Sequence, residues 1–251
     1  MATQYDDIAE QYRRSKLVPW RFYIEQFSLL ELMGDLHGKD VLDLACGEGY
    51  YTRLLKRNGA ARVVGVDLSP KMIELAEQRE HSEEQGIEYR VGDARTVEVP
   101  GTFDLVVAAY LLNYASTPAD LAAMCRTIAK HLKPGGRFCA VNNNPIQNPE
   151  RFPATRKYGF IKSGDHGTSG SPVRYHFFSS GDLDGPEVFQ LENYFLEPEL
   201  HLETFRNCGF HDATWHPMRL SPAEVHGPNP SHWDEFFVDT PVILFSATKG
   251  A

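Results

Sequence analysis

The chain has 251 residues and an acidic balance, with 25 Lys and Arg against 34 Asp and Glu and a formal net charge of −9. Such a surface repels phosphate backbones, which disfavours a general nucleic-acid-binding protein. The 15 Phe, 11 Tyr and 3 Trp residues are far more aromatic side chains than a disordered chain carries. We therefore expect a folded protein with a substantial core.

Three local signals bear on location, metals and partners. Residues 1–10 are polar and acidic, unlike a signal peptide, and the longest apolar run, residues 105–112, is too short to cross a bilayer. The four cysteines form no CxxC pair, and the ten histidines show no zinc-ligand spacing. We predict a cytoplasmic protein, a monomer or weak homodimer, with reduced thiols, no metal, and a small molecule as partner in place of a membrane or nucleic acid.

Apolar runs and helical segments alternate in the first 141 residues. Residues 1–37 read as helical and carry six aromatic side chains between positions 5 and 27. Strands are then expected at 41–44, 62–66, 87–91, 103–108 and 137–141, and helices at 51–57, 71–85 and 119–131. Ser69 and Pro70 are a typical N-cap and first residue for the second helix. This alternation predicts a parallel sheet with helices on both faces.

The pattern changes after residue 141. Residues 142–172 are rich in Asn, Pro, Gly and Ser, and strands follow at 173–178 and 188–195. A helix over 198–208 precedes a closing pair of strands at 210–215 and 242–248. We predict one domain over residues 1–251, with a helical lid (1–37), a cofactor-binding core (38–144), an inserted cap hairpin (145–195) and a C-terminal helix with closing strands (196–251).

The segment Val41-Leu-Asp-Leu-Ala-Cys-Gly-Glu-Gly49 carries the strongest chemical signal. An apolar strand enters a turn built on Gly47 and Gly49, and a helix follows, so the backbone and the free N–H groups of the helix can approach a ligand. A dinucleotide site fits such a turn, but its fingerprint needs a third glycine where this chain has Thr52. Asp43, four residues before Gly47, instead suits the cationic amino-acid end of S-adenosylmethionine.

Four further elements follow in order along the chain. Asp67 ends the second strand, where a carboxylate can accept hydrogen bonds from both ribose hydroxyls. Asp93 follows the third strand and can accept one from the exocyclic amine of adenine. Residues 103–114 form a strand whose end faces the reacting centre, and residues 132–138 form a helix-to-strand turn. Singly, the glycines are explained as turns and the aspartates as caps, but the five elements together favour a cofactor site.

Residues 41–141 resemble the core of the class I S-adenosylmethionine-dependent methyltransferases. The resemblance implies a Rossmann-like α/β fold with a seven-stranded, mostly parallel sheet whose last strand is antiparallel. It implies S-adenosyl-L-methionine as cofactor and S-adenosyl-L-homocysteine as product. Ala45 departs from the family, which more often has glycine there, although alanine still allows close approach of the backbone. The residues that the resemblance places at the cofactor are Tyr12, Asp43, Ala45, Gly47, Gly49, Asp67, Leu68, Asp93, Ala94 and Ala109.

Four segments, at 4–12, 45–53, 59–67 and 108–114, point to a narrower group. Together they resemble the toxoflavin-biosynthesis N-methyltransferase and its bacterial relatives, which methylate ring nitrogens of a flat azapteridine. The resemblance implies N-methylation of a small planar heterocycle in secondary metabolism. The cap, residues 145–195, has no residue-by-residue match, although it is the part that would choose the acceptor.

Methyl transfer from a sulfonium needs the nucleophile, the methyl group and the sulfur in line, with water kept out. A neutral nitrogen needs no base, whereas an oxygen nucleophile usually does. Enzymes that methylate exocyclic amines carry Asn/Asp-Pro-Pro-Tyr/Phe after the fourth strand, and residues 109–114 here read Ala-Tyr-Leu-Leu-Asn-Tyr. We therefore predict methylation of a ring nitrogen, mainly by proximity and orientation, between aromatic walls that stack on the acceptor and stabilise the sulfonium.

Aromatic and polar side chains are both predicted at the acceptor. The predicted acceptor-site residues are Trp20, Tyr110, Asn113, Asn142, Asn144 and Tyr175, and the predicted catalytic groups are Tyr110, Asn113, His166 and His176. Asn142 and Asn144 are also explained as turn caps, and His166 as a solvated loop residue. Alternative functions are O-methylation of a phenol or acid with a cap histidine as base, a non-catalytic S-adenosylmethionine-binding protein, and a nicotinamide dehydrogenase, which Thr52 and Asp43 disfavour.

Overall fold

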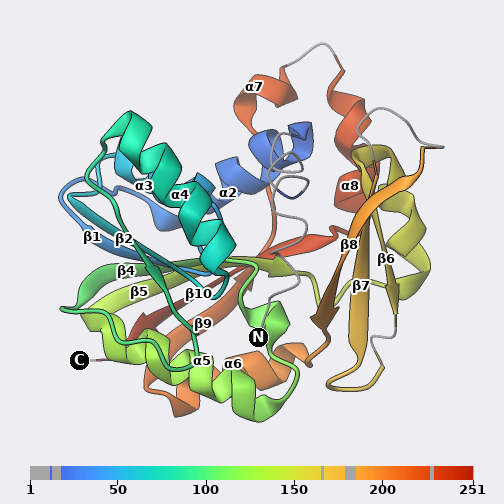
Figure 1. Cartoon of the computed structure of the whole chain (residues 1–251). Coiled ribbons are helices and arrows are strands. Elements are labelled where there is room, and N and C mark those ends of the chain that lie inside the picture. Colours follow the sequence, from blue (N-terminus) through green and yellow to red (C-terminus); the bar gives the residue numbers. More distant parts are fainter. Residues whose placement is uncertain (1–11, 13–17, 165–166, 179–184, 227–228, 251) are drawn as a thin grey trace.

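The computed structural model describes residues 12, 18–164, 167–178, 185–226 and 229–250, and its strands form two sheets (Figure 1). The larger sheet has seven strands in the order β3-β2-β1-β4-β5-β10-β9. The bounds of these strands are β1 Asp40–Leu44, β2 Arg62–Asp67, β3 Glu88–Val91, β4 Phe103–Ala109, β5 Leu132–Asn143, β9 Phe210–His216 and β10 Val242–Lys249.

The first five strands of the large sheet run parallel, and the last strand of the chain runs against its neighbours. β1 pairs in parallel with β2 and β4, while β3 and β5 extend the sheet in the same direction. β10 lies between β5 and β9 and is antiparallel to both. The predicted Rossmann-like sheet with an antiparallel last strand is therefore confirmed. β5 begins earlier than predicted, at Leu132.

Helices cover both faces of the large sheet (Figure 1). Their bounds are α2 Phe27–Met33, α3 Tyr50–Arg57, α4 Pro70–Glu83, α5 Pro118–His131 and α6 Pro198–Asn207. Alternate residues of each strand point to opposite faces, so Val41 packs in one core with Met72 of α4, and Leu42 packs in the other with Ile128 of α5. Ser69 is confirmed as the N-cap of α4, because its hydroxyl accepts a hydrogen bond from Met72 N at 3.1 Å.

The smaller sheet has three antiparallel strands, β6 Phe160–Gly164, β7 Pro172–Phe178 and β8 Glu187–Tyr194, preceded by the 3-10 helix η3 Pro149–Tyr158. Asn143, at the end of β5, donates to Asn193 of β8 at 2.7 Å, which places this cap sheet at the carboxyl end of the large one. The predicted hairpin was therefore incomplete. β6 was missed because its buried face carries Lys162, which breaks the apolar alternation expected of a strand.

Two segments flank the cap sheet. The π-helix η1 Arg21–Gln26 runs directly into α2, while residues 1–11 and 13–17 of the predicted lid lie outside the described part of the chain. Between β9 and β10 lie three short helices that the sequence analysis did not predict: α7 Pro222–Val225, η4 Pro230–Trp233 and α8 Asp234–Val238. Trp233 stacks on Tyr158 of η3, with ring centroids 5.7 Å apart, and so anchors this segment to the cap.

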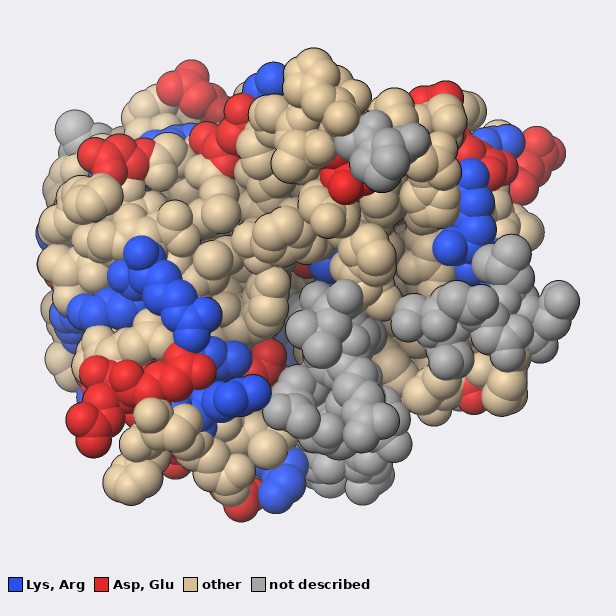
Figure 2. All heavy atoms as spheres, turned by 90° about the horizontal axis from the view of Figure 1, so that it is seen from above, with Lys and Arg blue, Asp and Glu red and all other residues tan. Residues whose placement is uncertain are grey.

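Charged side chains of both signs are interspersed on the face shown in Figure 2. Several exposed basic groups pair with acidic neighbours, among them Arg57 with Glu83 at 2.5 Å and Lys71 with Glu74 at 2.7 Å. None of the helices in the described ranges is both long and apolar enough to cross a membrane.

Lys162 is buried, and its ammonium donates to the carbonyl of Pro241 at 2.6 Å. Burial lowers the pKa of Lys162 well below its usual value. The unfolded chain then binds the Lys162 proton more tightly than the folded protein does. The free energy of unfolding therefore decreases as the pH falls from about 10.4 towards the folded pKa. The total decrease is about 1.4 kcal/mol for each pKa unit between the unfolded and the folded state. We expect Lys162→Met to become more stable relative to wild type as the pH falls through this range. Denaturant unfolding at pH 7 and pH 10.5 measures this, with exposed Lys71→Met as the control; an equal gain at both pH values would contradict it.

Candidate active site

The turn after β1 is built from residues in the left-handed region. Ala45, Gly47 and Gly49 have φ values of +62°, +57° and +82°. Asp67, at the end of β2, accepts hydrogen bonds from the backbone N–H of Gly47 (2.8 Å, to Oδ2) and of Ser69 (2.9 Å, to Oδ1). One carboxylate therefore connects the glycine turn to the start of α4.

Ala45 adopts a left-handed backbone although it carries a Cβ, which costs about 1–2 kcal/mol. Glycine removes this cost, but its greater conformational freedom stabilises the unfolded chain by about 0.4–1 kcal/mol. We expect Ala45→Gly to stabilise the protein by about 0.5–1 kcal/mol, a rise in melting temperature of about 1–4 °C. Ala129→Gly, inside α5, is the control and should lose about 1 kcal/mol. A lower melting temperature for Ala45→Gly would contradict the prediction.

The turn and the end of β4 border a narrow cavity, the loop cavity. Its lining consists of Tyr12, Asp43, Ala45, Cys46, Gly47, Glu48, Tyr50, Tyr51 and Ala109. Buried Asp43 accepts a hydrogen bond from the Thr52 hydroxyl at 2.7 Å, and Glu48 pairs with Arg53 at 2.7 Å. The described lining holds two carboxylates and no basic side chain, which suits a ligand with a positive charge.

The ends of β2 and β3 carry the other predicted cofactor residues. Leu68 is 52% exposed, and Ala94 is buried. Asp93 pairs with Arg95 at 2.7 Å, and hydrogen bonds from Arg95 lower the pKa of the Asp93 carboxyl. These three residues, like Asp67, do not line the loop cavity but follow the strands next to it in the sheet.

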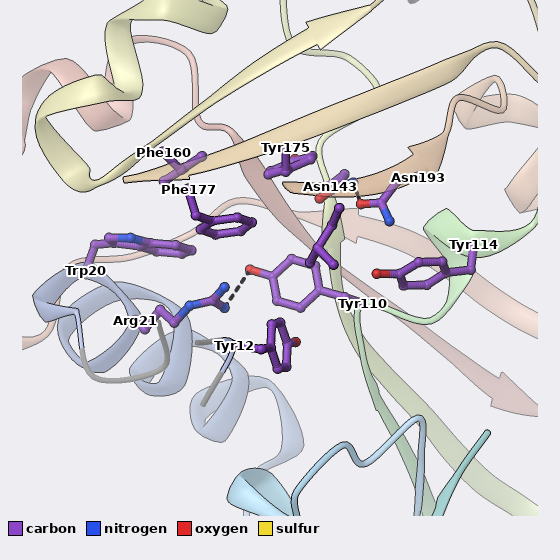
Figure 3. A pocket seen from close by; sticks show the side chains of 11 residues that line it. Tyr12, Trp20, Arg21, Tyr110, Tyr114, Asn143, Phe160, Tyr175, Phe177 and Asn193 are labelled. Carbon is purple, nitrogen blue, oxygen red and sulfur yellow. Dashed lines mark hydrogen bonds between the residues drawn. The ribbon is translucent and has the colours of Figure 1, made fainter. Parts of the chain in front are cut away.

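A second cavity, the aromatic pocket, lies between the N-terminal helix, the end of β4 and the cap sheet (Figure 3). It is lined by Tyr12, Trp20, Arg21, Tyr110, Tyr114, Asn143, Phe160, Tyr175, Phe177, Leu191 and Asn193. The predicted residues Trp20, Tyr110 and Tyr175 all line it. Tyr12 lines both cavities, and Tyr110 directly follows Ala109 of the loop cavity. The two cavities are therefore neighbours.

Most of the side chains that line the aromatic pocket are rings, and two of these rings carry a buried polar atom without a partner among the described residues. Trp20 contacts Phe160 at 5.1 Å between centroids, and Phe160 stacks on Tyr175 at 6.0 Å. The Trp20 Nε1 and the Tyr175 hydroxyl are buried and have no hydrogen-bond partner among the described residues. Burial raises the pKa of Tyr175 well above its usual value, so this hydroxyl keeps its proton. The pocket thus suits a flat ligand that accepts hydrogen bonds.

A buried polar network joins the two cavities. Arg21 and Glu25 form an ion pair at 2.9 Å, and Glu25 also accepts hydrogen bonds from the hydroxyls of Tyr51 (2.5 Å) and Tyr110. Burial and the charge of Glu25 raise the pKa of Tyr51 and Tyr110 well above the usual range. Tyr110 also has a left-handed backbone, with φ +68°, and such strain persists only where the surroundings hold it. The network therefore fixes Tyr110 at the boundary between the cavities.

The predicted asparagines lie beside the aromatic pocket. Asn113, Asn142 and Asn144 line a neighbouring cavity and are buried. Asn144 donates to the carbonyl of Thr240 at 2.8 Å and accepts from the backbone N–H of Ile146, so it holds the turn after β5. The explanation of Asn144 as a turn cap therefore agrees with its contacts.

His176, one of the two predicted histidines, is not brought to the pocket. His176 lies on the opposite face of β7 from Tyr175, because successive strand residues alternate. Its ring nitrogens lie 2.8 Å from the Ser163 hydroxyl and 2.7 Å from Glu187. His166 lies outside the described residues. Within the described ranges no group of three or more His, Cys, Asp and Glu side chains could hold a metal ion.

The sequence analysis missed Arg21, Glu25, Asn143 and Asn193. Arg21 and Glu25 stand four residues apart, the spacing of an ion pair on a helix, inside an aromatic-rich segment. That spacing was the available signal. Asn143 and Asn193 gave none, because their contact depends on how the cap sheet meets β5.

Comparison with known proteins gives concordant results. Residues 41–136 match the methyltransferase domain family. A demethylmenaquinone methyltransferase from Tropheryma whipplei (strain Twist) is 27% identical over 233 residues, 88% of each chain. A ubiquinone biosynthesis O-methyltransferase from Azotobacter vinelandii is 36% identical over 116 residues, 44% of this chain and 47% of its own. A crystal structure of an S-adenosylmethionine-dependent methyltransferase from Mesorhizobium loti has a TM-score of 0.62 and 22% identity, with 90% and 97% of the two chains covered.

The matched residues contain the turn after β1, Asp67 and Tyr110, which surround the loop cavity or follow the strands beside it. The acidic lining of the loop cavity suits a ligand with a cationic group, and Gly47 lets the backbone approach a ligand closely. The chain is therefore a methyltransferase that uses S-adenosylmethionine, with its methyltransferase domain in residues 41–136, and it has the fold of solved S-adenosylmethionine-dependent methyltransferases.

Proposed function

We propose that this methyltransferase methylates a ring nitrogen of a small planar heterocycle, of the azapteridine type methylated in toxoflavin biosynthesis. The observation that carries the proposal is the aromatic pocket, which shares Tyr12 with the loop cavity and has flat walls. The described lining holds one charged side chain, Arg21, and that guanidinium is paired with Glu25. An uncharged, flat acceptor suits such walls better than a carboxylate or a phosphate.

In this proposal S-adenosylmethionine occupies the loop cavity and the strand ends beside it. Asp43 accepts from the cationic amino group, and Asp67 accepts from the ribose hydroxyls. Asp93 already accepts from Arg95, so its contact with the adenine amine competes with this ion pair. The remaining residues that we assign to the cofactor surround its methionine, sulfonium and adenine parts: Tyr12, Ala45, Gly47, Gly49, Leu68, Ala94 and Ala109.

The sulfonium of S-adenosylmethionine supplies the electrophilic methyl group. The chain itself aligns the acceptor and excludes water. The Trp20 Nε1 and the Tyr175 hydroxyl donate to acceptor atoms on the rim of the ring. Tyr110 keeps its proton, because burial and Glu25 raise its pKa, and it does not act as a base at neutral pH. A ring nitrogen with a free lone pair needs no base.

Tyr110→Phe tests the absence of a base. We expect methyl transfer to slow by less than about a hundredfold, since a lost base costs about 10²–10⁴. The rate should stay level between about pH 6.5 and pH 9, because the pKa of Tyr110 is raised above its usual value of about 10. Initial rates with labelled S-adenosylmethionine measure this, with Tyr23→Phe as the control. A loss above about a thousandfold would contradict it.

O-methylation of a phenol is a second candidate, favoured by the contact between Tyr110 and Glu25. In that case the acceptor hydroxyl would lose its proton to Tyr110 as Tyr110 gives its own to Glu25. His176 of the cap does not act as the base for O-methylation, since it faces away from Tyr175. The ion pair with Arg21 disfavours protonation of Glu25, so we place this candidate second.

A labelling experiment distinguishes the two candidates. The protein is incubated with methyl-labelled S-adenosylmethionine and, separately, with an azapteridine, a pterin and a phenol. Mass spectrometry then locates the label. We expect it on a ring nitrogen of the azapteridine or the pterin. Label on the phenol oxygen alone would overturn N-methylation in favour of the second candidate.

A further inference from the structure

A third cavity lies next to the aromatic pocket, and we call it the amide cavity. Four asparagines line it: Asn113 of the short 3-10 helix η2 Leu112–Tyr114, and Asn142, Asn143 and Asn144 at the end of β5. Asn143 lines the aromatic pocket as well. The two cavities are also neighbours along the inner face of β7, where Val173 lines one and Tyr175 the other.

Asn113 is only 6% exposed, yet neither its Oδ1 nor its Nδ2 has a hydrogen-bond partner among the described residues. Asn142, 2% exposed, accepts from the backbone N–H of Leu112 at 3.3 Å, but its Nδ2 has no such partner. Asn143 donates to Asn193, and its Oδ1 has none. Buried polar atoms are costly to leave unpaired. The cavity therefore presents both donors and acceptors that a bound molecule can satisfy.

The amide cavity carries no charge in its described lining. His201 is buried and lies 3.0 Å from the carbonyl of Glu197, and burial lowers the pKa of His201, so its ring is neutral at pH 7. The remaining lining residues are apolar or aromatic, apart from the asparagines. A charged group would lose its hydration here without an opposite charge. A neutral group with both N–H and C=O fits, which is an amide or an imide.

We propose that the amide cavity is a subsite of the acceptor that binds an amide or imide edge of its ring. This inference rests on the proposed function, since it requires a flat acceptor in the aromatic pocket. The ring stacks between the aromatic walls, and its edge of alternating C=O and N–H reaches past Asn143 to Asn113. The acceptors that this site selects are thus fused-ring diones with free N–H groups, rather than quinols or simple phenols.

Calorimetry with two pteridine probes tests the subsite. Lumazine (pteridine-2,4-dione) and its 1,3-dimethyl derivative have the same ring and carbonyls, but only lumazine has the N–H donors. Both are titrated into the protein saturated with S-adenosylhomocysteine, so that no turnover occurs. We expect wild type to bind lumazine at least about tenfold more tightly, the effect of one hydrogen bond of about 1.4 kcal/mol. Equal affinity for the two probes would overturn the subsite and leave the aromatic pocket standing.

Asn113→Leu should weaken lumazine binding about ten- to hundredfold and abolish the preference between the probes. Asn207→Leu, at an exposed position at the end of α6, is the matched control and should bind as wild type does. Affinity for S-adenosylhomocysteine and the melting temperature report whether each variant is folded. Asn113→Ala replaces the leucine variant if that variant does not fold. Unchanged lumazine affinity in the folded variant would contradict the subsite. Failure of wild type to bind either probe would overturn both the subsite and the proposed acceptor class.

Discussion

Glu25→Ala is expected to lower the free energy of unfolding by about 3–5 kcal/mol, because it leaves the Arg21 guanidinium buried without its carboxylate. Glu25 is fully buried and holds Arg21, Tyr51 and Tyr110 together. Methyl transfer should also fall, because Arg21, Tyr51 and Tyr110 together lose the carboxylate that holds them between the two cavities. Denaturant unfolding and single-turnover rates measure the two effects.

Glu31→Ala is the matched control for Glu25→Ala. Glu31 pairs with Arg219 at 2.9 Å, but both side chains are exposed, so the loss should stay within about 1 kcal/mol. Glu25→Gln retains the size and one acceptor oxygen and should fall between the two. Equal unfolding free energies for Glu25→Ala and Glu31→Ala would show that the buried network does not stabilise the fold.

Asp67→Ala is expected to lower the affinity for S-adenosylmethionine by at least about a hundredfold. Two effects combine here: the carboxylate holds the N–H groups of Gly47 and Ser69, and by our proposal it accepts from the ribose hydroxyls. Hydrogen bonds to charged groups contribute about 1.5–3 kcal/mol each, so two lost bonds account for this factor. Calorimetry with S-adenosylhomocysteine measures it.

Two variants separate these effects. Asp67→Asn keeps one acceptor oxygen for the turn. An affinity of this variant between those of wild type and Asp67→Ala would identify the ribose contact. Asp35→Ala changes an exposed aspartate that accepts hydrogen bonds from His37, and it should bind as wild type does. Wild-type affinity in Asp67→Ala would remove the ribose from the proposal.

The large sheet could be predicted because its signals are local. Apolar runs such as Val41–Leu44 are buried on both faces, and the turn residues Gly47 and Gly49 follow at once. β6 could not be predicted, since Lys162 is buried by tertiary contacts, with the carbonyl of Pro241 and the rings of Phe152 and Tyr175.

The residues of the candidate site could likewise be predicted only where the signal lay in the local sequence. Trp20, Tyr110 and Tyr175 were predicted because aromatic walls suit a flat acceptor, and these residues lie in the segments that flank the cofactor core or directly after the fourth strand. Glu25 was missed, because a glutamate on a helix is normally exposed and here is buried by tertiary contacts. His176 was predicted beside Tyr175, yet adjacent strand residues face opposite sides, so alternation alone argued against one of the two.

Tyr12 forms part of the wall of both the loop cavity and the aromatic pocket. A ligand that fixes this ring for one cavity fixes it for the other, so the two binding free energies are coupled, and the coupling is equal in both directions. In the proposed function, S-adenosylhomocysteine that stays in the loop cavity after a turnover keeps Tyr12 in the position that the next acceptor binds. The resulting ternary complex is unproductive, and turnover is expected to decline at high acceptor concentration.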